Sequence, residues 1–436
     1  MVAGHEHRRP FSTSTLAKAE RADLLAYAQR GTPFHVGTGL PEPVYRQTHS
    51  CSWYAHACEY VDMKWPVAAA GSRRNIAESL VTVMPAFITD DRGRPDAELL
   101  RRALSEWAFV TPKRAAGPPP GEFAAALAWL EKHTVHVADL EEPNDGARLV
   151  RAALDALSKR LDGKSAAANT VARKRAVLVN AFNYAVELGR LNGNPVDGIA
   201  WKRPKQDDQV DRRCVVNRQQ AERLLAAVEA QGEVGRRLAA FFATQYYAAL
   251  RPAETINLRR KNMAALPEEG WGELLLTRSN PRGGTRWTDS GTSREERSLK
   301  HRSDETTRVV PAPPALVQRL RSHVEEFGYG HEGLLFVGPL GGLLDESSYL
   351  PAWRAARRTA LTDEECASPL AARPYDLRHA AVSTWLNAGV PPAQVAEWAG
   401  HSVAVLLRVY AKCIVGQDAG ARRLIDAALR DALEDS

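Results

Sequence analysis

Helical spacing of apolar residues dominates this chain and constrains its fold more than any other feature. The pattern runs almost without interruption from His49 to about Pro195; Trp53, Ala57 and Val61, for example, recur one helical turn apart. Predicted helices in this region cover residues 72–87, 98–108, 122–133, 146–161 and 167–188. The first half of the chain is therefore expected to be an all-helical body.

Strand-like patterns are confined to one part of the second half. A helix is expected to open at Asn217, because Gln220 follows it at the spacing of a capping box. Residues 272–277 and 306–311 then form short apolar runs on either side of a loop rich in glycine, serine and threonine. We predict two strands joined by a long, mobile hairpin, with helices again from about Ala315. The expected fold is mainly α with a small β-hairpin or sheet.

The length of 436 residues favours two or three domains. The clearest boundary is the charged, proline-containing segment 194–213, which carries little apolar pattern. We expect a two-domain protein with flanking segments. The predicted parts are a loosely ordered arm with one short helix (1–44), a helical domain (45–200), a linker (201–214), a mixed α/β domain (215–415) and an amphipathic tail helix (416–436).

Composition excludes several classes of protein. Hydrophobic residues make up 44% of the chain and charged residues 25%, which are globular proportions. The longest apolar run, about 238–250, is too short to span a bilayer, and the N-terminus has no secretory signal pattern. The five cysteines form no C-x-x-C pair, which favours a reducing cytoplasm and predicts no zinc site. The net charge of +6 is compatible with a polyanionic partner without requiring one.

Two arginines are expected at the beginnings of helices. Arg378 falls in the first turn of a predicted helix over 376–388, and Arg251 immediately precedes a helix that begins at Pro252. Free N–H groups at a helix start, together with a forked cation, can bind an anion. Glu254 lies close enough in sequence to hold the Arg251 guanidinium. Each arginine also has an ordinary interpretation, as a solvated side chain or as a cap on the preceding helix.

Three further residues could carry chemistry. His401 lies at the joint between a helix that ends at Gly400 and one capped by Ser402. Tyr410 lies eight residues further along that helix, and Lys300 lies in the predicted hairpin before its second strand. Taken singly, the histidine could be structural, the tyrosine could belong to the core, and the lysine could be an ordinary loop charge.

The order of these residues resembles that of the tyrosine recombinase (phage integrase) family. The densest match is within 374–412, which contains D-L-R-H, W-A-G-H-S and V-Y; segments 249–258 and 271–311 also match. Residues 45–200 resemble the family's core-binding domain in position and in the run A-N-T-V-A-R-K-R-A-V. One departure is Tyr375, where the family most often has histidine. A phenol with a pKa of about 10 is a poor base at pH 7.

The resemblance implies a chemistry for each residue. Tyr410 would attack a DNA phosphodiester and form a 3′-phosphotyrosyl bond. The catalytic set would be Arg251, Lys300, Tyr375, Arg378, His401 and Tyr410. In it, the arginines and His401 would stabilise the charge of the transition state, and Lys300 would protonate the leaving 5′-oxygen. No metal and no cofactor is implied.

The resemblance also implies partners. The two domains would clamp double-stranded DNA, and the tail would dock on a neighbouring subunit in a tetrameric synapse, with an accessory directionality factor as a further possible partner. Candidate phosphate contacts, which could equally be solvated charges, are Arg173, Lys174, Arg175, Lys202, Arg203 and Lys205. Two other functions stay open, a catalytically silent DNA-binding regulator and a type IB-like topoisomerase.

Overall fold

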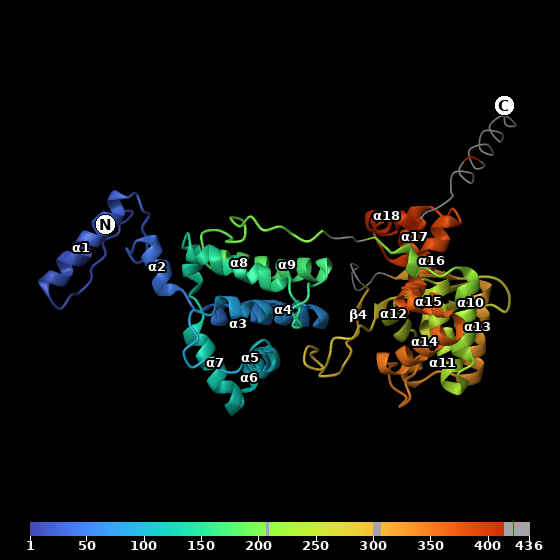
Figure 1. Ribbon diagram of the computed structural model, residues 1–436. Helices are drawn as coiled ribbons and strands as arrows, with labels where there is room; N and C mark the ends of the chain where they lie inside the picture. Colours follow the sequence, from blue (N-terminus) through green and yellow to red (C-terminus); the bar gives the residue numbers. More distant parts are fainter. Residues whose placement is uncertain (206–208, 300–306, 414–421, 423–436) are drawn as a thin grey trace. The chain divides into compact units, whose positions relative to one another are not determined.

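The computed structural model describes residues 1–205, 209–299, 307–413 and 422 (Figure 1). The chain divides into two compact units. The N-terminal unit comprises Met1–Gln206 together with Gly283–Gly291, and the C-terminal unit comprises Asp207–Arg282 together with Thr292–Ser436. The prediction of a mainly helical fold with few strands is confirmed.

Among the described residues of the N-terminal unit, all regular secondary structure is helical. Its α-helices are α1 (Ser14–Gln29), α2 (Glu42–His49), α3 (Trp53–Lys64), α4 (Ala70–Val83), α5 (Ala97–Ala103), α6 (Thr111–Ala116), α7 (Gly121–His133), α8 (Asp145–Leu157) and α9 (Ala168–Glu187). The helices α8 and α9 lie along α4 (Figure 1). Trp53 packs in the core with ring centroids 4.4 Å from Phe87 and 5.1 Å from Phe182. The helical spacing that begins at Trp53 therefore reflects a real buried face.

The predicted helices of this unit appear with small differences. The helix expected over 98–108 is divided into α5 and a π-helical turn, Leu104–Ala108. The helices α2 and α6 were not predicted. Each has a proline at its beginning and spans at most eight residues, which leaves too few turns for a periodic apolar pattern.

A segment from the second half of the chain completes the core of the N-terminal unit. Trp287 is only 6% exposed and lies in this core, with its ring centroid 6.2 Å from that of Trp65. Arg73, itself buried, donates to the Trp287 carbonyl at 2.9 Å and to both carboxylate oxygens of Asp289 at 2.7 and 3.0 Å. The loop 283–291, part of the hairpin predicted to be mobile, is thus anchored by an aromatic side chain and a bidentate ion pair.

The C-terminal unit combines helices with short strands. Its α-helices are α10 (Arg218–Glu229), α11 (Gly232–Tyr247), α12 (Pro252–Ile256), α13 (Pro314–Phe327), α14 (Glu346–Ala360), α15 (Asp363–Ala367), α16 (Tyr375–Asn387), α17 (Pro392–Ala399) and α18 (Val403–Tyr410). Its strands are β1 (Met263–Ala265), β2 (Gly272–Leu276), β3 (Arg278–Ser279), β4 (Arg297–Ser298) and β5 (Arg308–Ala312). The core centres on α11, where Phe241 packs 5.0 Å from Tyr349 and Phe242 packs 4.8 Å from Trp353, measured between ring centroids.

The predicted strand pairing is confirmed and extended. Strands β2 and β5 pair antiparallel, with Leu274 opposite Val310 and Leu276 opposite Arg308, and β1 joins them in the order β1-β2-β5. A second, two-stranded sheet, β3-β4, interrupts the connection. It was not predicted because its strands have only two residues each.

Helix ends position the residues that the sequence singled out. Asn217 and Gln220 form the expected capping box, Pro252 begins α12, and Ser402 caps α18 by accepting from the Val405 N–H. Gly400 ends α17 in the left-handed conformation, at φ 67°. Among the described residues, none of the helices has the length and apolarity that a bilayer crossing would require.

Candidate active site

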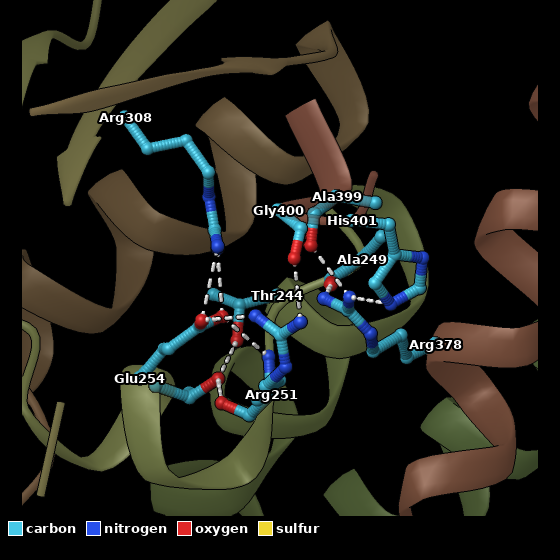
Figure 2. A network of polar contacts seen from close by, with 10 residues as sticks. Thr244, Ala249, Arg251, Glu254, Arg308, Arg378, Ala399, Gly400 and His401 are labelled. Carbon is cyan, nitrogen blue, oxygen red and sulfur yellow. Dashed lines mark hydrogen bonds and ion pairs between the residues drawn. The ribbon is translucent and has the colours of Figure 1, made fainter. Parts of the chain in front are cut away.

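Arg251 is held at the junction of α11 and α12. Its Nη1 donates to Glu254 Oε1 at 2.7 Å, and its backbone N–H donates to Glu254 Oε2 at 2.8 Å. Its Nη2 donates to the Gly400 carbonyl at 2.8 Å (Figure 2). Glu254 therefore holds the guanidinium, as the sequence suggested, and the α17 end fixes its other side. The side chain keeps 18% of its surface exposed, so it can still reach a ligand.

Arg378 lies in the first turn of α16 and is fully buried. It donates to the carbonyls of Ala249 and Ala399, the latter at 2.5 Å, and its Nη2 lies 2.9 Å from His401 Nε2. Its guanidinium lies beside that of Arg251 (Figure 2). Burial lowers the pKa of Arg378, and the positive charge of Arg251 acts in the same direction. Two cations from distant parts of the chain are thus gathered at one place.

A third arginine, Arg308 on β5, was missed by the sequence analysis. Its Nη1 and Nη2 donate to the two carboxylate oxygens of Glu254 at 3.0 and 2.7 Å, and both side chains are at most 2% exposed. A signal existed. Arg308 alternates with Val310 and Ala312 on the inward side of β5, where a charge needs a buried partner.

We call Arg251, Glu254, Arg308 and Arg378 the arginine cluster. Burial alone would raise the pKa of Glu254, but Arg308 and Arg251 hold it well below its usual range, so the carboxylate stays ionised. One carboxylate then faces three guanidinium groups. The buried Nε atoms of Arg308 and Arg378 have no hydrogen-bond partner in the structure. This positive excess suits a phosphate group, whose oxygens accept from forked donors.

His401 adds a neutral donor beside the arginine cluster. Burial, reinforced by Arg378 and Arg251, lowers its pKa to about 3, so the ring is uncharged at pH 7. Because Arg378 donates to Nε2, the ring proton resides on Nδ1. That buried Nδ1 has no hydrogen-bond partner in the structure, so its N–H donor is unused.

Two tyrosine side chains, Tyr410 and Tyr375, lie next to the arginine cluster and His401. Tyr410, the last residue of α18, is fully buried, and its Oη lies 2.9 Å from His379 Nδ1. Its ring centroid lies 6.1 Å from that of His401. Burial raises the pKa of Tyr410, with Arg378 acting against that rise. Tyr375 is half-buried and meets the His379 ring edge-on at 5.0 Å.

Tyr375 also acts on Arg251. Burial lowers the Arg251 pKa, but Glu254 and Tyr375 together outweigh it, so the pKa is raised. The structure thus brings five of the six predicted residues to one site, while Lys300 lies outside the described residues. The described part of the chain contains no cluster of histidine, cysteine and acidic residues suited to a metal ion.

The candidate phosphate contacts lie in the N-terminal unit. On α9, the Lys174 Nζ donates to Thr82 Oγ1 at 2.9 Å, and burial lowers the pKa of both Lys174 and Arg175. The basic residues that follow α9 are exposed: Lys202, Arg203 and Lys205. Arg173 on α9 is exposed as well, so Arg173 and the latter three are the more accessible to a polyanion.

Comparison with known proteins identifies the class. Residues 215–413 match the model of the phage integrase family. Residues 215–413 therefore form a phage integrase domain, and this match supports a tyrosine-type site-specific recombinase.

One solved structure agrees in fold, and two others are similar at lower TM-scores. The Tn1549 transposon integrase, in complex with transposon right end DNA, has a TM-score of 0.51 and 14% identity, over 76% of this chain and 99% of that one. The XerH recombinase bound to difH substrate has a TM-score of 0.44 and 14% identity, over 82% and 95%. The lambda integrase bound to DNA has a TM-score of 0.39 and 13% identity, over 71% and 92%. A search of curated proteins found no match.

Proposed function

We propose that this recombinase cleaves and rejoins DNA strands through a covalent 3′-phosphotyrosyl bond at Tyr410. The observation that carries the proposal is the convergence of Arg251, Arg378 and His401 beside the Tyr410 phenol. A phosphodiester in this place would receive two guanidinium forks and a neutral imidazole. These donors are preorganised by carbonyls and a carboxylate, so they need little rearrangement as charge develops on the phosphate.

The covalent step needs a nucleophile, an acid and no external energy source. The Tyr410 oxygen attacks phosphorus, the bond to the 5′-oxygen breaks, and the phosphotyrosyl bond conserves the energy for rejoining. We assign the acid that protonates the 5′-oxygen to Lys300, on the family resemblance alone. The paired arginines supply the charge stabilisation, so the proposed reaction uses no metal and no cofactor.

Tyr410 must move before it reacts. Its side chain is fully buried in this structure, so a bound DNA backbone cannot reach the hydroxyl directly. Tyr410 ends α18, where a short shift of the helix end would turn the phenol outward. We propose that DNA binding accompanies this shift.

The proposed partner is double-stranded DNA, to which the Tn1549 and lambda integrases are bound in their structures. The exposed cations Lys202, Arg203 and Lys205 would contact its phosphates. A tetrameric synapse, with a tail that docks on a neighbouring subunit, and an accessory directionality factor extend the proposal. The tail, 416–436, lies outside the described residues apart from Arg422. The free state of all five cysteines supports a reducing cytoplasmic setting.

A nicked suicide substrate tests the proposal, because loss of a short 5′ fragment after cleavage traps the covalent complex. Mass spectrometry of the adduct is expected to find the DNA on Tyr410, and Tyr410→Phe is expected to abolish the adduct. Tyr329→Phe, a tyrosine of the same unit that packs under Arg260, serves as the matched control. An adduct on another residue would overturn the assignment.

The burial of Tyr410 favours a second candidate, a DNA-binding protein without cleavage activity. In that case, the wild type binds DNA and forms no adduct under any condition in which the DNA is saturating. The suicide-substrate assay separates the two functions directly.

A further inference from the structure

The nucleophile of the proposed reaction needs a proton acceptor. A phenol attacks phosphorus only as its proton leaves, and burial raises the pKa of Tyr410 above that of a free tyrosine. The proton must therefore pass to a neighbouring group at the time of attack. Tyr375, at the position where the resembling family most often has histidine, is itself a phenol and cannot serve.

In the buried position of Tyr410, His379 contacts the hydroxyl that must lose its proton, and the proposal requires this contact to be kept when the end of α18 shifts. The His379 Nδ1 is 2.9 Å from Tyr410 Oη, within the range of a hydrogen bond, and the ring centroids are 5.6 Å apart. Its place is set by α16, where it follows Arg378 directly in the first turn. One helix therefore presents a phosphate-binding guanidinium and an imidazole at adjacent positions.

The surroundings keep this imidazole uncharged. Burial, with Arg378 and Arg373 acting in the same direction, lowers the pKa of His379 to about 4. From the other packed elements it faces the Tyr410 phenol, and on its own helix the Tyr375 ring. At pH 7, a lone pair on the ring is thus available to accept a proton.

We propose that His379 is the general base that takes the proton from Tyr410, an inference that rests on the proposed function. The Oη–H bond breaks, its proton moves to Nδ1, and the oxygen electrons form the bond to phosphorus. The bond from phosphorus to the 5′-oxygen breaks, and that oxygen takes a proton from the general acid. In rejoining, the 5′-hydroxyl gives its proton back to the deprotonated general acid as its oxygen attacks phosphorus. The phosphotyrosyl bond breaks, and the imidazolium returns its proton to the Tyr410 oxygen.

The bound phosphate makes this transfer feasible. In the free protein, neighbouring guanidinium groups oppose a positive charge on His379. A phosphodiester held by Arg251 and Arg378 brings a negative charge to the same place, and the developing transition state adds more. The imidazolium is therefore most stable when the reaction forms it. General-base catalysis of this kind contributes about 10²- to 10⁴-fold in rate.

The same hydrogen bond could instead lock Tyr410 in its buried position, and the two roles predict opposite results. Removal of a base slows cleavage, whereas removal of a lock speeds it. The sign of the rate change in a His379 variant therefore distinguishes them.

The test measures single-turnover adduct formation on the nicked suicide substrate at saturating DNA. His379→Gln retains a hydrogen-bonding group but accepts no proton near neutral pH, so its rate is expected to fall about 10²- to 10⁴-fold with DNA affinity unchanged. The wild-type rate is expected to fall as the pH drops through the imidazole pKa, and the variant is expected to lose this dependence. Exposed His331→Gln is the matched control and keeps the wild-type rate.

Chemical rescue guards against misfolding as an explanation. Imidazole added to His379→Gly is expected to restore adduct formation in proportion to its concentration, which a purely structural role does not produce. An unchanged or faster rate in His379→Gln, or no rescue in a His379→Gly variant that still binds DNA, overturns the assignment. If the wild type forms no adduct at all, the proposed function itself fails, and the inference fails with it.

Discussion

Replacing Glu254 by glutamine removes the one carboxylate of the arginine cluster while keeping its size. Glu254 is 2% exposed and accepts from both Nη atoms of Arg308 and from the Nη1 and backbone N–H of Arg251. In the variant, Arg308 stays buried with its charge uncompensated, and one amide hydrogen-bond donor faces a guanidinium donor. The folded C-terminal unit must therefore lose stability.

The size of the loss follows from the burial of both partners. Breaking a buried ion pair by removing one partner costs about 3–5 kcal/mol, and the near-complete burial of Glu254 and Arg308 places this pair in that class. A typical domain has about 5–15 kcal/mol of stability in total, so the expected loss is a large fraction. In the double variant Glu254→Gln/Arg308→Met, the most deeply buried of the uncompensated charges is removed as well, and part of the stability is expected to return.

Urea unfolding, followed by hydrogen exchange in peptides from α11 and α12, measures this loss of stability in the C-terminal unit specifically. The difference is also expected to depend on pH. The folded pKa of Glu254 is lowered, so its contribution is complete above the ordinary glutamate pKa of 4.5 and is lost as the pH falls towards the folded pKa. The wild type and the variant should therefore converge in acid. A loss below about 0.5 kcal/mol at pH 7, typical of a neutral surface change, would refute the reasoning.

Three further predictions address other parts of the molecule. Gly400→Ala would place a Cβ 2.2 Å from Arg308 Nη1 and 3.2 Å from Arg251 Nη1, at a φ of 67° that alanine rarely adopts, so adduct formation and thermal stability should both fall. The control is Gly341→Ala, which has a similar φ of 78° but no atom within 4 Å of the added Cβ, and it should change stability alone. Trp287→Ala is expected to destabilise the N-terminal unit by about 3–5 kcal/mol, which faster hydrogen exchange in α3 and α4 would reveal. An effect restricted to the C-terminal unit would contradict the assignment of residues 283–291 to the N-terminal unit. Buried His56 and half-buried His379 and His401 have pKa values lowered to about 4, 4 and 3, so unfolding binds protons and the melting temperature should fall as the pH drops below 6.5. A flat profile between pH 6.5 and 4 would contradict this prediction.

Local signals in the sequence predicted local structure well. The capping box at Asn217, the proline start of α12 and the cap of α18 at Ser402 depend on residues within one turn, so their spacing is visible in the sequence. The pairing of β2 with β5 was also predictable, because two apolar runs border a loop without helical pattern.

Features that depend on contacts across the chain were missed. Trp287 and Asp289 resemble ordinary loop residues until Arg73 and Trp65, more than 200 positions away, are known to receive them. Arg308 was overlooked for the same reason, since its partner Glu254 is 54 positions distant. A charged residue on the inward side of a strand indicates that a buried partner of opposite charge is needed, but only the tertiary fold shows which residue that partner is.

The geometry of the site depends most on a residue without a side chain. Gly400 ends α17 in a left-handed conformation, and its carbonyl accepts from Arg251 while the preceding Ala399 carbonyl accepts from Arg378. Its missing Cβ leaves the space that the Arg308 guanidinium occupies. The sequence suggested Gly400 only as a helix stop, yet the same conformation aims two successive carbonyls at two arginines and places His401 beside them. The helix end thus orders the anion site, and for this reason the spacing from Gly400 to His401 carries functional information that helix capping alone does not require.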